Sequence, residues 1–244
     1  SVIALRVSLN LAWLDLPNLF PSFDDPGRWL PLLQRHAELI DSASSHTRVT
    51  AVEPGEAVQR HYAESLELLR LAETRVPPAK TIVDVGSGGG YPGLVLAILR
   101  PESAVHLVEP LQKRARLLQS ISADLGLANV TVHAVRGEEA GRGDLRGAAD
   151  LVTARAVAAL PELLEYTAPL ARRGGWLAFP KGSGHPEELA VASNALRELG
   201  CEHRATLSMR PEVSSSLAVL LIEKTADTPD RYPRRPGMPA KRPL

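Results

Sequence analysis

The sequence predicts an α/β fold: a seven-stranded, mostly parallel sheet with an antiparallel hairpin at one edge, preceded by a helical N-terminal extension. Three observations support this fold class. After Lys80, short runs of β-branched and aliphatic residues alternate with helical patterns, which is typical of a parallel sheet with crossover helices. The last two runs have no helical pattern between them and so predict a hairpin. Before Pro77 and Pro78, only helical patterns occur.

The N-terminal extension, residues 1–79, contains two amphipathic helical patterns. In segments 28–40 and 56–72, apolar residues recur every three or four positions. Pro54 precedes the second segment, and the two prolines at 77–78 close the region, as expected of residues that interrupt helices. The first residues lack the basic start and the cleavage site of a signal peptide, so we expect ordinary N-terminal chain there.

Residues 80–227 form the predicted sheet domain. The five parallel strands are expected at 81–85, 104–110, 130–137, 149–157 and 174–182. The helices that follow strands are expected at 91–100, 111–126, 160–171 and 185–200. The terminal hairpin is expected at 202–210 and 215–225. Because strands joined by helices run parallel with right-handed crossovers, the carboxyl ends of the five strands should meet at one edge of the sheet.

The composition argues against several classes of protein. A lone cysteine, Cys201, cannot form an internal disulfide and is typical of a small buried hydrophobe, so we expect a reducing compartment, the cytoplasm. The seven histidines show no metal-ligand spacing, which argues against a metal site. No apolar run is long enough to cross a bilayer, so we expect no membrane partner. Nothing signals an oligomer, and we expect a monomer.

The net charge is zero, but the charges are unevenly distributed. The last stretch, residues 228–244, carries five basic residues against one acidic residue, together with five prolines, and is expected to pack no core. The basic residues are Arg231, Arg234, Arg235, Lys241 and Arg242. They either contact RNA phosphates or simply keep the tail solvated. Tyr232 and the prolines suggest an extended strap along the domain.

The segment DVGSGGGYPG, residues 84–93, predicts a ligand-binding loop between the first strand and its helix. A triphosphate loop needs Gly-Lys-Ser/Thr, whereas two aliphatic residues follow Gly93. A dinucleotide loop is harder to exclude, since residues 88–93 match G-x-G-x-x-G and Glu109 lies at the end of the second strand.

Two details of this loop argue against a dinucleotide. Asp84 places a carboxylate against the loop, and Pro92 removes an N–H near the helix start. A pyrophosphate binds free N–H groups at a positive helix end, so both features are unfavourable to it. A cofactor with an ammonium and a sulfonium tolerates them, which favours S-adenosyl-L-methionine, whose product is S-adenosyl-L-homocysteine. Glu109 would then accept hydrogen bonds from the ribose hydroxyls, and residues 136–139 would lie along the adenine.

Several motifs, taken in chain order, are similar to those of one known family. They are DVGSGGGYPGLVLAILRP, HLVEPLQKR, VRGEEA, DLVTARAVA, LAFPKG and RYPRRPGMPAKRPL. Their order, the Gly-x-Pro-Gly form of the loop and the closing basic run are together more specific than any one motif. From about Arg60 to its end, the chain resembles the bacterial 16S ribosomal RNA guanine-N7 methyltransferases, formerly called glucose-inhibited division protein B.

The resemblance implies a Rossmann-like, S-adenosylmethionine-dependent methyltransferase fold and methyl transfer to N7 of one guanine of 16S rRNA in the small ribosomal subunit. The N-terminal motifs depart from the family. The segment SASSHTRVT keeps only Val49 and Thr50 of an Asn-Leu-Thr motif, and the family's His-x-x-Asp-Ser runs from His61 to Ser65 with Glu64 at the acidic position. The Arg that many members place before the last strand is replaced here by serines.

The chemistry of this reaction needs positioning more than proton transfer. Guanine N7 has a lone pair and no proton, so in-line geometry suffices and no general base is required. Arg155, at the end of the fourth strand, and Lys181, at the end of the fifth, are the predicted catalytic residues, since both align with basic residues of the family and an Arg can read the guanine edge. Arg155 has the alternative role of holding the cofactor carboxylate or a phosphate. Arg60 and His61 are predicted to face the RNA.

The predicted cofactor-binding residues are Asp84, Gly86, Ser87, Gly88, Gly90, Tyr91, Glu109, Gly137, Glu138, Glu139 and Arg155. Two other functions stay open: a small-molecule methyltransferase and a cofactor-binding regulator without catalysis. The basic tail and the low aromatic content favour RNA over a small acceptor. A nicotinamide dehydrogenase is the weakest alternative.

Overall fold

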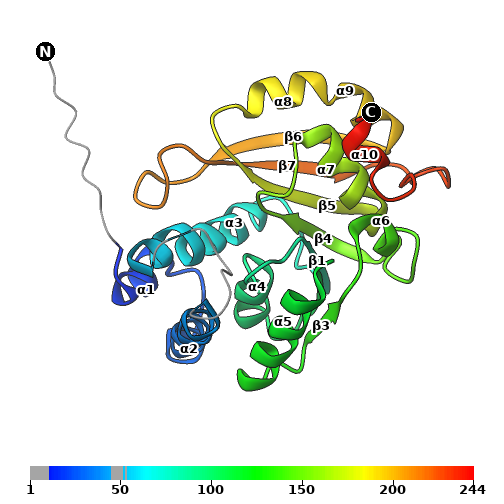
Figure 1. Ribbon diagram of the computed structural model, residues 1–244. Helices are drawn as coiled ribbons and strands as arrows, with labels where there is room; N and C mark the ends of the chain where they lie inside the picture. The colour runs from blue at the N-terminus through cyan, green and yellow to red at the C-terminus, as the bar shows by residue number, and fades with distance from the viewer. Residues whose placement is uncertain (1–10, 45–51, 53) are drawn as a thin grey trace, which may run out of the picture.

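The computed structural model describes residues 11–44, 52 and 54–244, and a sheet of seven strands lies at the centre of this part of the chain (Figure 1). The strand order is β3-β2-β1-β4-β5-β7-β6. The strands are β1 Thr81–Val85, β2 Ala104–Val108, β3 Val130–His133, β4 Ala149–Ala154, β5 Ala171–Lys181, β6 Cys201–Ser208 and β7 Ala218–Lys224. β1 to β5 pair in parallel, and β7 runs antiparallel to both of its neighbours. The predicted parallel sheet with a terminal hairpin is confirmed.

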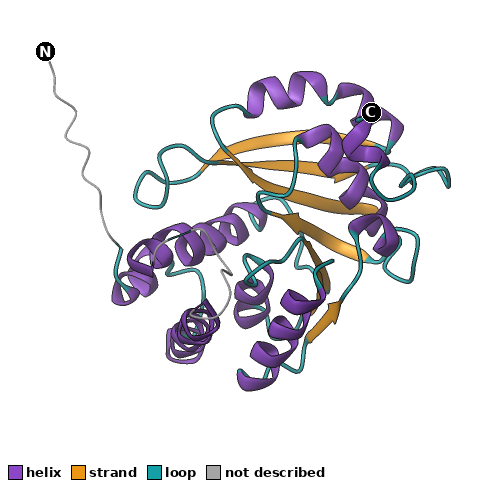
Figure 2. Cartoon of the chain, in the orientation of Figure 1, coloured by secondary structure: helices purple, strands orange, loops and turns teal. Residues whose placement is uncertain are grey.

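Helices cover both faces of the sheet (Figure 2). One face carries α1 Leu16–Leu19, α2 Pro26–Ser44, α3 Glu64–Ala72, α4 Gly93–Leu99 and α5 Gln112–Asp124. The other carries α6 Gly137–Ala140, α7 Leu160–Thr167, α8 His185–Val191 and α9 Ser193–Glu198, with the short α10 Met238–Lys241 of the tail nearby. In the described part of the chain, no helix is long and apolar enough to span a membrane.

The interior strands β1, β4 and β7 are buried along almost their whole length because both faces of the sheet are covered. Along β1, Ile82 packs with the helices of the first face, while Val83 packs with those of the second. Along β4, Leu151 likewise packs with the helices of the first face and Val152 with those of the second. This two-residue alternation sends neighbouring side chains into two separate apolar clusters. Cys201 is buried in the second cluster.

Some element boundaries differ from the prediction. β2, β3 and β4 end before the predicted ends, at Val108, His133 and Ala154, because the chain turns away at the carboxyl edge. The helix predicted at 185–200 is two helices that meet at Ala192. The helix predicted at 56–72 begins with a 3₁₀ turn and continues as a π-helical stretch, η3 Val58–Ala63, before α3. Apolar periodicity locates such segments without distinguishing these helix types.

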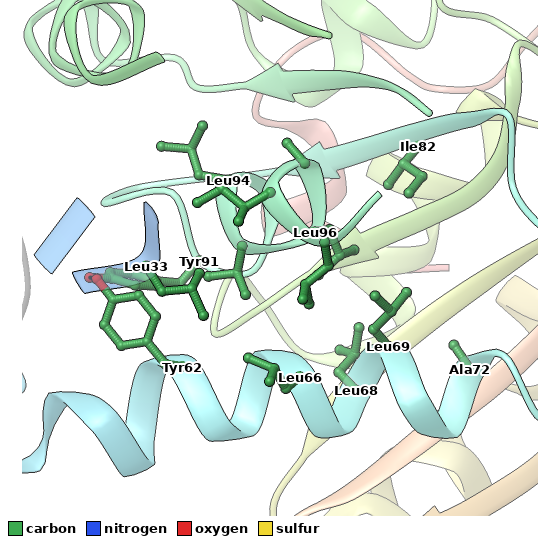
Figure 3. Packing of buried hydrophobic residues seen from close by; sticks show 14 of the residues in the cluster. Leu33, Tyr62, Leu66, Leu68, Leu69, Ala72, Ile82, Tyr91, Leu94 and Leu96 are labelled. Atoms are coloured by element: carbon green, nitrogen blue, oxygen red, sulfur yellow. Dashed lines mark hydrogen bonds between the residues drawn. The ribbon is translucent and has the colours of Figure 1, made fainter. Parts of the chain in front are cut away.

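The extension shares one core with the sheet. Leu66 and Leu69 of α3 pack in the same apolar cluster as Ile82 of β1 and Leu96 of α4 (Figure 3). The boundary predicted after residue 79 therefore marks a change of sequence pattern. The hydrophobic core continues across this boundary.

A buried ion pair also joins the extension to the hairpin. The carboxylate of Glu67 in α3 is fully buried, and Arg210, which follows β6, donates to it with its Nη2 at 2.7 Å. Arg70 donates to the same carboxylate, so its charge is balanced and its lone pairs are used.

A chain of hydrogen bonds ties the extension to the glycine loop. His36 of α2 is fully buried, and its Nε2 lies 2.9 Å from the carbonyl oxygen of Gly89. Because that oxygen can only accept, Nε2 carries the proton, and Nδ1 accepts from the Tyr62 hydroxyl at 3.1 Å. The Tyr62 oxygen in turn accepts from the Tyr91 hydroxyl at 3.1 Å. Every polar atom of this buried chain thus has a partner.

The C-terminal tail lies along the second face of the sheet. Arg146 donates to the carbonyl oxygens of Thr228 and Tyr232, at 2.7 and 2.9 Å. Arg234 forms two parallel hydrogen bonds, at 2.9 and 2.6 Å, with the fully buried carboxylate of Glu165 in α7. A two-bond guanidinium–carboxylate pair of this kind fixes orientation as well as position.

Further along the tail, the backbone N–H of Gly237 donates to Glu138 of α6 at 3.0 Å. Tyr232 and Pro239 are buried against the domain. The expectation that the tail packs no core is therefore wrong. The tail does lie along the domain as suggested, but it consists of turns and the short helix α10 and is not an extended strap. The sequence could not show that buried carboxylates from two distant helices, Glu138 and Glu165, would meet this segment.

The buried state of His36 predicts a pH-dependent stability. Burial lowers the pKa of His36 from 6.5 to about 4, so the unfolded chain binds a proton more readily than the folded chain. The stabilisation is complete above pH 6.5 and is lost as the pH falls from 6.5 towards 4, by up to about 3 kcal/mol. We expect His36→Gln to flatten this part of the stability curve, measured by urea unfolding at several pH values.

The control for this experiment is His203→Gln, because His203 is exposed on β6. This variant should keep the wild-type pH dependence. An identical loss of stability on acidification in wild type and His36→Gln would contradict the assignment.

Candidate functional site

Two cavities lie side by side at the carboxyl ends of the parallel strands. The smaller, about 240 Å³, lies over the ends of β1 and β2 and is bounded by α6 and α7. The larger, about 770 Å³, lies between η3, the ends of β4 and β5, and the loop between β6 and β7. Arg155 and Ala156 line the larger cavity, and the next residue, Val157, lines the smaller one. Ala156 has φ 53°, a strained conformation for a residue with a side chain, so this link is a constrained wall between the two cavities.

The glycine loop requires glycine for reasons of backbone geometry. Gly86, Gly88 and Gly90 all have left-handed φ angles, of 73°, 56° and 92°. A Cβ atom at Gly86 would also lie 2.7 Å from the side chain of Val157. The conformation of the turn itself therefore requires these three alternating glycines. For this reason, their number is weaker evidence for a bound ligand than the sequence suggested. The walls of the two cavities are the stronger support.

Asp84 lies beneath the loop and lines neither cavity. Its fully buried carboxylate accepts hydrogen bonds from the Thr153 hydroxyl at 2.9 Å and from the N–H of Gly93 at 3.3 Å. Burial raises the pKa of Asp84 to about 6, although these donors lower it. The carboxylate thus occupies the N-terminus of α4, where a phosphate would bind in a dinucleotide loop. The side chain also fastens the loop to β4.

Glu109 and Ser87 support the loop from below. The Glu109 carboxylate, 2% exposed, accepts from the backbone N–H groups of Gly88 at 2.9 Å and Leu111 at 3.0 Å. The Ser87 hydroxyl donates to the carbonyl oxygen of Asp84 at 3.0 Å. Neither side chain lines a cavity. Contact of Glu109 with a ribose stays a prediction.

The smaller cavity has both apolar and polar walls. Its lining residues are Val85, Gly86, Val108, Pro110, Arg136, Gly137, Glu138, Val157, Glu162 and Tyr166. Of the predicted cofactor-binding residues, Gly86, Gly137 and Glu138 are therefore brought together here. Glu139 is exposed outside the cavity, and its carboxylate accepts from the N–H of Arg136 at 2.8 Å at the start of α6.

Arg155 is the central cation of the larger cavity. Its Nη1 donates to the carbonyl oxygen of Arg60 at 2.7 Å, and its Nη2 donates to Nδ1 of His61 at 2.7 Å. The guanidinium carbon lies 5.5 Å from the centre of the Tyr91 ring, within the range of a cation–π contact. Glu64 is a more distant partner, at 3.5 Å from Nη1. Arg155 therefore joins the end of β4 to η3.

Lys181 lines the same cavity from the end of β5, as the sequence predicted for its position. Its Nζ donates to Glu188 at 2.7 Å and to the carbonyl oxygen of Ala158 at 2.9 Å. The side chain is only 11% exposed. Lys181 is thus held in place by α8 and by the segment that precedes α7.

His61 and Tyr91 stack face to face beside Arg155. Their ring centres lie 4.1 Å apart with 13° between the planes. Because a guanidinium only donates, Nδ1 of His61 accepts from Arg155 and is unprotonated. Burial, with the Arg155 charge beside it, lowers the pKa of His61 to about 3. Tyr91 is buried beneath this layer and lines neither cavity.

The predicted RNA-binding residues fall into two groups. Arg60 and His61 line the larger cavity, whereas no tail residue lines either cavity. Arg234 is bound to Glu165, as described above, and Arg231 pairs with Glu198 of α9 at 2.6 Å. The remaining tail cations, Arg235, Lys241 and Arg242, have exposed side chains. Contact of any of these with RNA stays a prediction.

Sequence reasoning missed the acid of the larger cavity, Glu64, and the buried pair His36 and Tyr62. The signal for Glu64 was its place at the acidic position of His-x-x-Asp-Ser. Val49 and Thr50, the other N-terminal motif, lie outside the described residues. Among the residues that the structure describes, no group of three or more His, Cys, Asp or Glu is arranged to hold a metal ion.

Comparisons with known proteins agree on one family. A family model described as rRNA small subunit methyltransferase G matches residues 30–215. The chain is 41% identical over 212 residues to the ribosomal RNA small subunit methyltransferase G of Desulfitobacterium hafniense, covering 86% of this chain and 87% of that protein. It is 43% identical over 190 residues to the protein of the same name from Roseiflexus castenholzii, covering 78% of this chain and 80% of that one.

A solved structure supports the fold. It is a mutant of the 16S rRNA (adenine(1408)-N(1))-methyltransferase from Catenulisporales acidiphilia with its cosubstrate S-adenosylmethionine. The TM-score is 0.50 at 19% identity, over 68% of this chain and 93% of that one. The long match to the family model and the identities above 40% over most of the chain are decisive for classification. The chain belongs to the rRNA small subunit methyltransferase G family.

Proposed function

We propose that this chain transfers the methyl group of S-adenosylmethionine to N7 of a single guanine of 16S rRNA, guanine 527 in the usual rRNA numbering. The observation that carries the proposal is the pair of adjoining cavities on either side of the link Arg155–Val157. One cavity lies beside Gly86 of the glycine loop and has both apolar and polar walls, and the other is wider and carries cations. Family membership supports the same reaction.

The residues of the smaller cavity fit an adenosyl group. Val85, Val108 and Pro110 offer apolar surface for a flat base, and Gly86 and Gly137 leave room beside it. The start of α4 is closed to phosphate by Asp84, so the loop suits a cofactor without a pyrophosphate. When bound, S-adenosylmethionine supplies an electrophilic methyl group on a sulfonium.

The side chains near the larger cavity position the acceptor base and transfer no proton. Guanine N7 has no proton to lose, so a base is unnecessary. His36 and His61, with pKa values of about 4 and 3, stay neutral near pH 7, and each has a ring nitrogen engaged by a neighbour. In-line approach then depends on rigid walls, which the bonded Arg155 and Lys181 provide.

The larger cavity suits an RNA acceptor. Arg60, Arg155 and Lys181 line it, and phosphates are attracted by such cations. Guanine presents O6 and N7 to donors, for which an Arg is suited. One chain forms both cavities, so the proposal needs no second copy. We place the reaction in the cytoplasm, where such a substrate would be found.

The proposal predicts a selective activity. We expect the protein to transfer labelled methyl groups to small ribosomal subunits, or to their 16S rRNA, from a strain that lacks this modification. Fully modified subunits should accept almost none, because their target N7 is already methylated. Equal labelling of both preparations, or labelling of neither, would exclude the proposed function.

Gly86→Ala should weaken cofactor binding. The new methyl would lie 2.7 Å from Val157 and force either the loop or the cavity wall to move. We expect the dissociation constant for S-adenosylhomocysteine, measured by calorimetry, to rise about tenfold or more, equivalent to about 1.4 kcal/mol. Gly147→Ala is the matched control, since Gly147 also has a left-handed φ, of 63°, but nothing lies within 4 Å of its added Cβ. Equal affinities in the two variants would contradict the assignment of the smaller cavity.

Arg155→Ala should impair catalysis more than folding. Loss of the guanidinium releases His61 and η3 from the end of β4, and misplacement of a reacting group by about 1 Å costs about 100-fold. We expect kcat for RNA methylation to fall about 100-fold. The control Arg172→Ala removes an exposed ion pair with Asp150 away from both cavities and should keep wild-type rates. If cofactor affinity falls while kcat is kept, Arg155 holds the cofactor instead.

A further inference from the structure

One acid lies among the cations of the larger cavity. Glu64, in the first turn of α3, is the only Asp or Glu among the described residues that line it, beside Arg60, Arg155 and Lys181. A carboxylate here is unfavourable for phosphate, so a cavity that only held the RNA backbone would have no use for it. Its presence points to a second kind of recognition.

The Glu64 carboxylate is also poorly bonded for its burial. Its side chain is 13% exposed, and within the described part of the chain its hydrogen-bond partner is Nη1 of Arg155 at 3.5 Å. That is longer than the roughly 2.7–2.9 Å of a strong charge-assisted bond. The same Nη1 lies closer to the carbonyl oxygen of Arg60, at 2.7 Å. Burial raises the pKa of Glu64 to about 7, although Arg155 and Arg60 lower it.

Other buried carboxylates of the molecule have better partners. Glu67 and Glu165 are each bound by an arginine at 2.7 Å or less, and Glu109 accepts two backbone N–H groups at 2.9 and 3.0 Å. Buried acids are normally satisfied in this way. Glu64 differs because it borders the cavity, so a ligand can supply the donors that the protein does not.

Among the RNA bases, guanine supplies the matching pair of donors. Its Watson–Crick edge carries N1–H and the 2-amino group side by side, whereas adenine and cytosine place an acceptor next to their amino group, and uracil has one N–H between two carbonyls. An ionised carboxylate has two acceptor oxygens and no donor, so it pairs with guanine and is repelled by the others. This edge lies across the base from N7, so contact with it leaves N7 free to react.

We propose that Glu64 binds the Watson–Crick edge of the target guanine, its two oxygens accepting from N1–H and the 2-amino group. This inference rests on the proposed function and deepens it by naming the group that selects guanine. Arg155, which contacts Glu64 and begins the link to the smaller cavity, would then lie beside the base and would not contact its Watson–Crick edge. The target nucleotide must be out of any base pair to present this edge.

The test compares guanine with inosine, which lacks only the 2-amino group. Two 16S rRNAs, one with guanine and one with inosine at the target position, are assembled into small subunits, and kcat/KM for methyl transfer is measured for both. For the wild type we expect guanine to be preferred about 10- to 100-fold, the range for the loss of one hydrogen bond to a charged group. In Glu64→Gln the preference should fall to about one or below, because the new amide NH₂ faces a guanine donor.

The controls separate base recognition from other roles of Glu64. Glu56→Gln changes an exposed acid that pairs with Arg60 outside the cavity, and it should keep the wild-type preference. Calorimetry with S-adenosylhomocysteine checks that each variant is folded, and Glu64→Asp serves as a second variant, with a weakened preference expected. If Glu64 only positions Arg155, both RNAs lose activity equally and the preference survives, which would overturn the inference.

The wild-type comparison does not depend on any variant. A wild-type enzyme that methylates guanine and inosine equally well would also overturn the inference, while leaving the proposed function intact. No transfer to the guanine-containing RNA would instead refute the proposed function itself, and the inference with it.

Discussion

The arrangement of the site depends on one buried chain of hydrogen bonds, from Tyr91 through Tyr62 and His36 to the carbonyl oxygen of Gly89. It joins the N-terminal extension to the glycine loop, so the extension cannot move without disturbing the loop. The Tyr91 ring also supports His61 and lies under Arg155. Each polar atom of the chain is buried and paired, and loss of one member would leave an unsatisfied group in the core. The extension is therefore part of the site.

The two cavities are mechanically connected by the short link after β4. Ala156 adopts a left-handed φ between Arg155, which faces one cavity, and Val157, which faces the other. Val157 in turn packs so closely on Gly86 that no side chain fits there. A strained residue persists only where its surroundings determine its conformation, and here the glycine loop and η3 do so from opposite sides. Cofactor and acceptor positions are thus set by the same few residues.

Buried acids fasten the parts of the molecule that the sequence places far apart. Glu67 holds Arg210 after β6, and Glu165 holds Arg234 of the tail. Glu138 reaches the tail backbone at Gly237 while it also lines the smaller cavity. The carboxylates of Glu165 and Glu138 explain why a basic, proline-rich tail is ordered against the domain. They also mean that part of the tail's positive charge is used within the protein.

The sequence by itself determined the order of strands and helices, the hairpin and the position of the glycine loop, because periodicity and glycine placement are local properties. The sequence also indicated that Arg155 and Lys181 lie at the carboxyl ends of β4 and β5, since topology brings those ends to one edge. Only the tertiary structure decided that Asp84 accepts from Thr153 and lines neither cavity, that Arg234 binds Glu165, and that Glu64 faces the larger cavity. These roles depend on partners 69 to 91 residues away in the chain, and no local pattern records which distant group a charged side chain will meet.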